Sequence, residues 1–175
     1  MKYRDIILVA VLVVAVAIVT NTSAYMRKET TTVNNNFVPA IVDCVINETF
    51  TDNVKSSIMV QNTSDVPAYI RLRVVSYWVD ENGAIQHEQS DSVQFNYDVT
   101  NWIKDTDNDT YYYTGIVDVD AQVELLKASY TLTTKNNLYQ VVDIFAEAIQ
   151  ADPADAVIAA WNVDVNSSGN IIKVN

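Results

Sequence analysis

The sequence predicts an all-β protein, an antiparallel β-sandwich of the jelly-roll or immunoglobulin-like kind with one short helix near the C-terminus. Many short segments alternate apolar and polar residues with the period of two that is typical of half-buried strands. Only one segment, close to the C-terminus, has the capping chemistry of a helix. Strands at such short spacing favour a sandwich, and a chain of 175 residues can bury a full core as one domain.

The longest alternating segment, residues 68–79, is predicted to be the central strand of a sheet. One of its faces is apolar apart from Ser76, and it carries Ala68, Ile70, Leu72, Val74 and Trp78. The opposite face carries Tyr69, Arg71, Arg73, Val75 and Tyr77. This segment is long for a strand, which favours a position at the centre of a sheet. Turn residues lie at both of its ends, Pro67 before it and Asn82-Gly83 after it.

Residues 1–24 have the features of an export signal. A short basic start is followed by an unbroken apolar run, residues 6–19, and then by small polar residues. As a helix this run would span about 21 Å, less than the roughly 30 Å of a membrane core, so a cleaved signal is favoured over a permanent anchor. We expect cleavage between Ala24 and Tyr25 and a secreted protein at the cell surface or in the extracellular matrix.

A polar arm, residues 25–36, follows the signal. It is rich in Thr and Asn and has no apolar periodicity, so it cannot bury itself. Its middle residues are nevertheless compatible with a strand, namely Thr30, Thr31, Thr32 and Val33. Because an antiparallel sandwich leaves unpaired strand edges, we predict that this arm adds as a strand to a neighbouring copy. Such a head-to-tail contact grows filaments rather than closed dimers.

The remaining segments complete a single predicted domain, residues 37–175. Strands are expected at 37–46, 54–60, 119–126, 129–133, 139–149 and 171–174, and a hairpin is expected to join 102–103 with 111–117. In the first of these strands Cys44 falls in phase with the apolar residues, which predicts a buried small side chain. The helix is expected at 154–161, capped by Asp152 and with Pro153 in its first turn.

Composition argues against several functions. The net charge of −11 repels phosphate backbones, so nucleic acid is not an expected partner. One cysteine excludes an internal disulfide. His87-Glu88 begins like a zinc-protease motif, but Asp91 stands where the second histidine is needed, and the chain has one histidine in total. A nucleophile elbow is also missing. We therefore expect no enzyme, no catalytic residue and no cofactor.

Two local patterns keep alternative interpretations open. Asp105, Asp107 and Asp109 have the spacing of the first ligands of a calcium loop, but the glycine and glutamate that complete such a loop are absent. An acidic hairpin tip is expected, with a weak calcium contact as the alternative. The run Tyr111-Tyr112-Tyr113 resembles a carbohydrate-stacking platform. Alternation predicts instead that the Tyr112 ring faces opposite to its neighbours.

Taken in order, these features resemble the TasA/camelysin family of exported Gram-positive proteins, including the BsaA-type members that depend on the SipW signal peptidase. The matching stretches include the signal ending in Thr22-Ser-Ala-Tyr25, the segment Val60-Gln-Asn-Thr-Ser-Asp-Val-Pro-Ala-Tyr-Ile-Arg-Leu-Arg-Val74, and Asn101-Trp102 before the tyrosine-rich hairpin. Ala146-Glu-Ala-Ile-Gln-Ala151 and the helix end Ala159-Ala-Trp161 complete the match. Met26-Arg-Lys-Glu29 and the turn before Glu124 depart from the family pattern.

The resemblance implies a secreted structural subunit of biofilm-matrix fibres. Its partners would be further copies of itself, a signal peptidase of the SipW type and other matrix components. In such fibres, the N-terminal segment that signal cleavage frees adds as a strand to the next subunit. Camelysin-like members are also described as metalloproteases, which makes a secreted protease the first alternative. A monomeric cell-surface adhesion module is the second.

Overall fold

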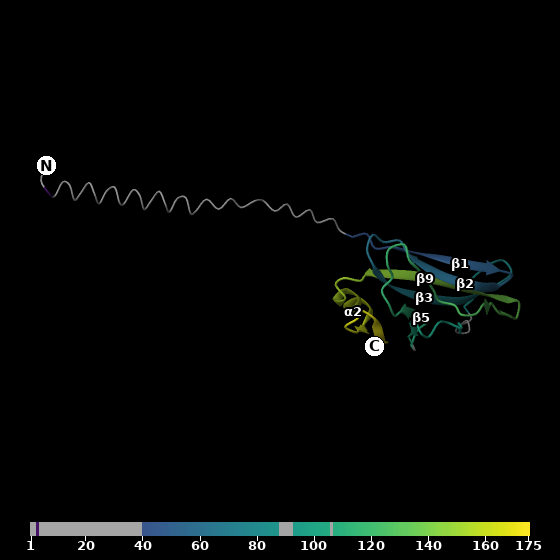
Figure 1. Cartoon of the computed structure of the whole chain (residues 1–175). Helices are drawn as coiled ribbons and strands as arrows, with labels where there is room; N and C mark the ends of the chain where they lie inside the picture. Colours follow the sequence, from purple (N-terminus) through teal and green to yellow (C-terminus); the bar gives the residue numbers. More distant parts are fainter. Residues whose placement is uncertain (1–2, 4–39, 88–92, 106) are drawn as a thin grey trace. The chain divides into compact units, whose positions relative to one another are not determined.

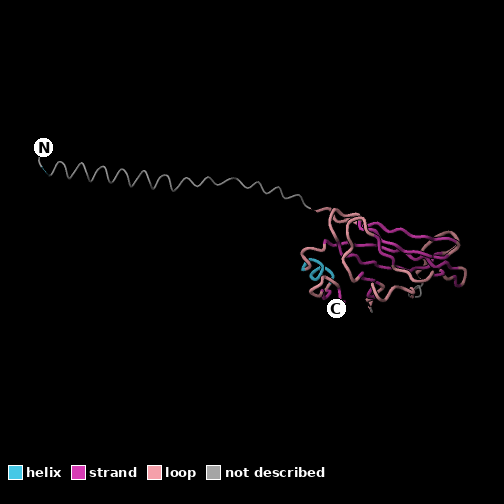
Figure 2. The backbone as a smooth tube through the Cα atoms, viewed as in Figure 1, coloured by secondary structure: helices cyan, strands magenta, loops and turns pink. Residues whose placement is uncertain are grey.

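The computed structural model of the chain contains two antiparallel sheets that pack face to face, as the sequence predicts (Figures 1 and 2). One sheet has four strands: β1 (Cys44–Thr51), β2 (Val54–Asn62), β6 (Gln122–Glu124) and β7 (Tyr130–Thr131). The other has five, in the order β4 (Trp102–Lys104), β5 (Thr110–Tyr113), β3 (Ala68–Val79), β9 (Leu138–Gln150) and β8 (Thr134–Lys135). The fold is therefore all-β and sandwich-like.

The structure describes residues 3, 40–87, 93–105 and 107–175, and these lie almost entirely in the compact unit Pro39–Asn175. The predicted signal and arm, residues 1–36, are outside the described residues apart from Tyr3. Within the described part of the chain, no helix is both long enough and apolar enough to cross a membrane.

The predicted central strand is the centre of the five-stranded sheet. β3 pairs along its whole length with β9, in a register that places Leu72 opposite Ala146 and Val74 opposite Ile144. On its other side β3 pairs with β5, where Leu72 lies opposite Tyr111. Leu72 therefore has a strand neighbour on both sides and lies in the core between the sheets, where it is fully buried.

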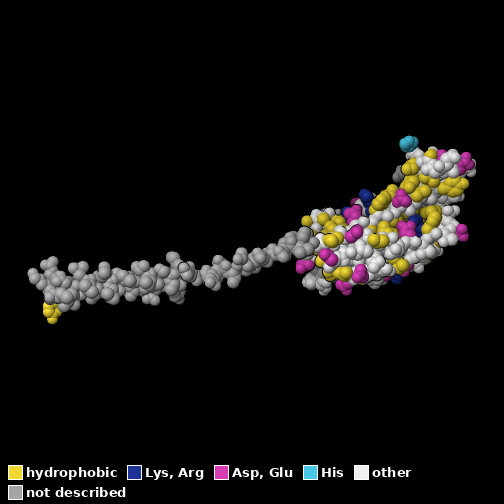
Figure 3. Space-filling model, turned by 90° about the horizontal axis from the view of Figure 1, so that it is seen from above, with side chains coloured by type: hydrophobic (Ala, Val, Ile, Leu, Met, Phe, Trp, Pro, Cys, Tyr) yellow, Lys and Arg dark blue, Asp and Glu magenta, His cyan; other side chains and the backbone are white. Residues whose placement is uncertain are grey.

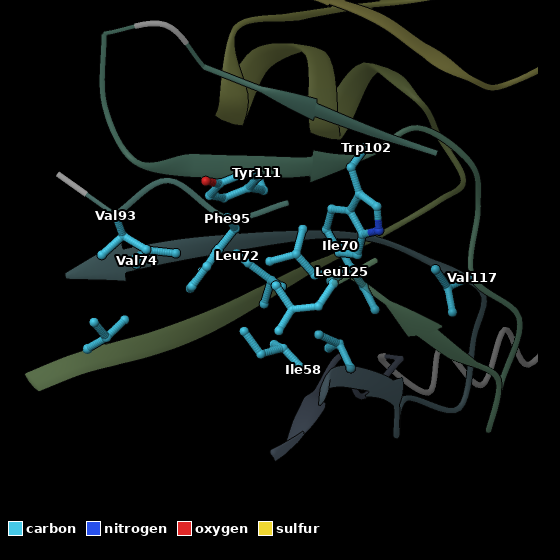
Figure 4. Packing of buried hydrophobic residues seen from close by; sticks show 13 residues of the cluster. Ile58, Ile70, Leu72, Val74, Val93, Phe95, Trp102, Tyr111, Val117 and Leu125 are labelled. Carbon is cyan, nitrogen blue, oxygen red and sulfur yellow. The ribbon is translucent and has the colours of Figure 1, made fainter. Parts of the chain in front are cut away.

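The main core fills the space between the two sheets (Figure 4). It is built from the inward faces of β2, β3, β4 and β5 together with the loops that carry Val93, Phe95, Val117 and Leu125. Aromatic rings meet edge to face in this core, and Phe95 stands nearly perpendicular to Tyr130 with 5.1 Å between ring centroids. Burial of such rings supplies much of the driving force for folding.

A small C-terminal lobe covers part of the outer face of the five-stranded sheet. It consists of α2 (Asp155–Trp161), β10 (Val163–Val165) and β11 (Ile171–Val174), and Figure 1 shows it at one end of the sandwich. Its apolar residues form a second cluster with Tyr69 and Tyr112: Val157, Trp161, Val163 and Ile171. Tyr111 belongs to the main core, so the prediction that the Tyr112 ring faces the opposite way is confirmed.

Two details of the predicted elements are wrong. Asp152 does not cap the helix: the N-cap is Ala154, and no side chain hydrogen-bonds the free amides there. The first strand begins at Cys44, so residues 40–43 of the predicted strand 37–46 lie outside it and bond to a loop, while residues 37–39 are not among the described residues. Asp43 accepts from the Thr63 amide, and the Ile41 amide donates to the Asp65 carboxylate. The short strands β8 and β10 were not predicted.

Candidate assembly edge

Most of β9 is an open sheet edge. Among the described strands, only the two residues of β8 pair with it on the side away from β3, at Leu138 and Tyr139. The Gln140 amide donates to the Thr133 carbonyl on this side. Alternation then directs the N–H and C=O groups of the next even-numbered residues away from β3: Val142, Ile144, Ala146 and Ala148. In the described part of the chain, no strand pairs with these residues.

The side chains of the same residues point into the sandwich, where the core is incompletely covered. Ile144, Ala146 and Ala148 pack against the main core but remain partly exposed, as do Cys44 and Ile46 from β1. β1 is the edge of the other sheet, and it pairs only with β2 among the described strands. The two open edges therefore lie on the same side of the sandwich, with a partly exposed strip of core between them.

β1 and β9 run in opposite directions across this open side. The Glu147 carboxylate acts electrostatically on Cys44 near the start of β1. Phe50, near the end of β1, shares a cavity of about 430 Å³ with the start of β9, Tyr139 to Asp143. Some Cα atoms of the two strands approach within 8 Å. An added strand that paired with β1 and β9 at once would need about 9.5 Å between these two strands. Inserting such a strand must therefore move β1 away from β9 where the two now approach most closely.

A second cavity, of about 630 Å³, lies where β9 ends. Its lining is mostly apolar and comes from three parts of the chain: Ala40, Val66, Pro67, Ile116, Asp118, Gln150, Ala151 and Asp152. Ile116 is 41% exposed there. The open edge of β9 thus has a cavity at each end, and each cavity can accept a side chain from a segment that lies along the edge.

Cys44 is half-buried at this edge. Desolvation, followed in importance by the negative charges of Asp43 and Glu147, raises the pKa of its thiol to about 11. The thiolate, which is the reactive form, is therefore scarce at neutral pH. This agrees with the predicted role of Cys44 as a small apolar side chain, although it is less buried than the pattern predicts.

The three aspartates of the predicted hairpin tip make separate local contacts. Asp105 accepts hydrogen bonds from the Asp107 amide and from the Asn108 side chain. Asp109 forms an ion pair with Lys104, with 2.8 Å between Oδ1 and Nζ. Across residues 40–87, 93–105 and 107–175, no group of three or more His, Cys, Asp or Glu side chains is placed to hold a metal ion. The aspartates support the turn between β4 and β5 instead.

Several predicted residues lie outside the described part of the chain. These are the cleavage residues Ala24 and Tyr25, the arm residues Thr30, Thr31, Thr32 and Val33, and the segment from Glu88 to Asp91. His87 is described and is exposed. Sequence reasoning predicted an open edge but did not identify it as β9. No local signal marks that edge, because alternation reports which face of a strand is buried and not which strands pair with it.

No protein-family model, curated protein or solved structure matches this chain. Its described residues define an all-β domain in which one side of β9 is largely open beside a partly exposed core.

Proposed function

We propose that the chain is a secreted structural subunit of extracellular matrix fibres, of the TasA/camelysin type, and that it assembles by strand addition. The observation that supports this most directly is the open edge of β9. There, main-chain groups that no described strand pairs with lie beside core residues that β1 and β9 leave partly exposed. An exposed edge of this length favours association unless something covers it. The proposed occupant is the N-terminal arm of another copy.

The arm has the chemistry that such an edge requires. Thr30, Thr31, Thr32 and Val33 are β-branched, and their main-chain groups can extend the ladder of β9. Main-chain bonds hold the added strand, while alternate side chains cover Ile144 and Ala146 on the core side. Because the arm and the edge are different surfaces of one chain, each copy can bind one neighbour and receive another, which gives an open filament.

Processing would control this assembly. While residues 1–24 hold the chain at the membrane, the arm is restricted, and cleavage by a signal peptidase of the SipW type would release it. This role needs no catalysis and no cofactor. A camelysin-like protease would cleave casein in a chelator-sensitive manner, whereas a monomeric adhesion module would bind a surface without forming fibres. The subunit proposed here should form fibres and should not cleave casein.

Electron microscopy of two purified forms tests the proposal. Residues 25–175 should form fibres after concentration, whereas residues 37–175 should remain monomeric with an unchanged circular dichroism spectrum. Adding the peptide 25–36 to the shorter form supplies the matched control, because it should bind the folded domain without producing fibres. Fibres that form equally well from residues 37–175 would refute the arm as donor and would indicate lateral packing of whole domains.

A further inference from the structure

The outer face of the five-stranded sheet carries a polar hollow beside the C-terminal lobe. Its volume is about 320 Å³, and it is lined by Arg71, Arg73, Asn108, Thr110, Tyr112 and Glu147. Strand register explains this gathering. Arg71 lies opposite Tyr112 on β5 and opposite Glu147 on β9, and Arg73 lies opposite Thr110. Directly paired residues project from the same face of a sheet, so three strands contribute side chains to one place.

Arg71 is held in position by its neighbours. Its Nε and Nη2 donate to Oε2 of Glu147 at 3.0 and 2.6 Å. Its guanidinium carbon lies 4.8 Å from the centre of the Trp161 ring and 5.9 Å from that of Tyr112. A cation fixed by a carboxylate and by two ring faces is oriented before any ligand arrives. Arg71 and Glu147 also neutralise each other, so together they add no net charge to the hollow.

Arg73 differs from Arg71. Its side chain is exposed, and its guanidinium lies 5.6 Å from the centre of the Phe145 ring, which is itself 47% exposed. Arg73 forms no ion pair with any residue of 40–87, 93–105 or 107–175. The lining of the hollow therefore has one uncompensated positive charge, although the chain as a whole carries −11.

We propose that this hollow binds one carboxylate-bearing sugar of an acidic polysaccharide. A sugar ring both donates and accepts hydrogen bonds, and the lining offers both functions through the Asn108 amide, the Thr110 hydroxyl and the Glu147 carboxylate. The single free charge of Arg73 matches one carboxylate per sugar, and a guanidinium can bind it through two parallel hydrogen bonds. Phe145 provides a flat apolar surface next to it. The volume is at the small end of ligand sites.

An acidic peptide is the competing ligand, since it too could pair with Arg73. Its main-chain groups could also pair with Asn108 and Thr110, but a flexible peptide has no rigid ring that presents several donating and accepting hydroxyl groups together. The sugar therefore uses more of the lining. The hollow lies on the outer face of the sheet, on the face opposite to the main core. The binding proposed here does not depend on fibre assembly.

Calorimetric titration of the full-length chain with oligogalacturonate tests the proposal. Binding is expected, and Arg73→Gln should weaken it by about tenfold or more, because a charge-assisted hydrogen bond is lost. Lys173→Gln is the matched control: it removes one exposed positive charge on β11 and should leave the affinity within about twofold. A neutral maltooligosaccharide and polyglutamate should bind at least tenfold more weakly than oligogalacturonate.

Three results would overturn the proposal. The unaltered protein could fail to bind oligogalacturonate, or the Arg73 and Lys173 variants could weaken binding equally, which would indicate a nonspecific charge effect. Polyglutamate could also bind as tightly as oligogalacturonate and with the same dependence on Arg73, which would assign the hollow to acidic peptides.

Discussion

At the scale of single residues, Asp98 shows how one carboxylate organises a turn. Its Oδ1 lies 3.0 Å from Nζ of Lys127 and accepts from the Thr100 amide, and its Oδ2 accepts from the Asn101 side chain at 2.7 Å. Its backbone carbonyl also receives the amide of Trp102, the first residue of β4. Asp98 thereby connects the strand that carries a buried tryptophan to the loop at Lys127.

These contacts predict a specific dependence of stability on pH. The Lys127 ammonium, opposed by some desolvation and aided by Asn101 and Thr100, lowers the pKa of Asp98 from 3.8 to about 2. A lowered pKa in the folded state stabilises the fold above the unfolded pKa, and this contribution disappears as pH falls from about 4 to about 2. Urea unfolding should show Asp98→Asn to be less stable than the parent at pH 6, with the difference vanishing near pH 2.

Asp155→Asn is a suitable control, since it removes an exposed carboxylate from α2 instead. A constant difference between Asp98→Asn and the parent over the whole pH range would contradict the assigned charge interaction. It would show that the variant acts through turn geometry alone.

Leu72 gives a second prediction at this scale. It is fully buried between the sheets and packs in the main core. Leu72→Ala should lower the free energy of unfolding by about 2–5 kcal/mol, because it removes buried methyl groups and leaves a cavity. Val75→Ala on the outer face of the same strand is the control, and it should cost about 0.5 kcal/mol or less. Equal effects in denaturant titrations would mean that the faces of β3 are wrongly assigned.

At the scale of elements, the outward amides of β9 allow the open edge to be altered without breaking the sheet. The amide of Ala146 points away from β3, so proline at this position removes no bond of the β3–β9 ladder. We expect Ala146→Pro to fold as a monomer and to lose fibre formation, because an added strand can no longer pair there. Ala146→Ser keeps the amide and should assemble normally, as electron microscopy can show.

If Ala146→Pro formed fibres as readily as Ala146→Ser while both were folded, the edge of β9 would not be the acceptor. The remaining described edge of comparable length, β1, would then become the principal candidate.

Elements could be predicted where their pattern is long. Twelve residues of β3 and thirteen of β9 alternate strictly enough to fix both strands and the side that each presents to the core. Strands of two or three residues, such as β8 and β10, contain less than two periods and carry no such signal. Val42 is in phase with Cys44 and Ile46, yet it lies before the strand, and the neighbouring Ile41 amide bonds to the Asp65 carboxylate. Hydrogen bonds to a polar loop can thus decide where a strand begins, and a pattern of apolar and polar side chains does not report such bonds.

The open edge could not be identified from the sequence for a different reason. Whether β9 is an edge depends on which strands pair with it, and its partner β3 lies far away in the chain. Local alternation reports which face is buried but not which neighbours a strand has. The hollow at Arg73 could not be predicted for the same reason, since its residues come from three separate strands and from a hairpin tip that only the folded chain brings together.

At the scale of the whole molecule, processing at the N-terminus should decide between a tethered chain and a free subunit. We expect N-terminal sequencing of the exported protein to begin at Tyr25, because a small residue, Ala24, ends the polar tail of the signal. Acidic side chains are spread over the face shown in Figure 3, with hydrophobic patches between them, and the net charge of the chain is −11. A secreted product that retains residues 6–19 would instead indicate an anchored protein.

The pairing of β3 with β9 also determines when this chain can fold. Arg71 and Glu147, which bond directly, are 76 positions apart. Closing so long a loop costs entropy before any ladder bond forms, and topologies dominated by such pairs fold slowly, in milliseconds to seconds. Synthesis begins at the N-terminus, so β3 exists well before its partner. Until Gln150 has been made, the apolar face of β3 has no complete sheet to join, and apolar surface left exposed in this way favours misassembly of the nascent chain.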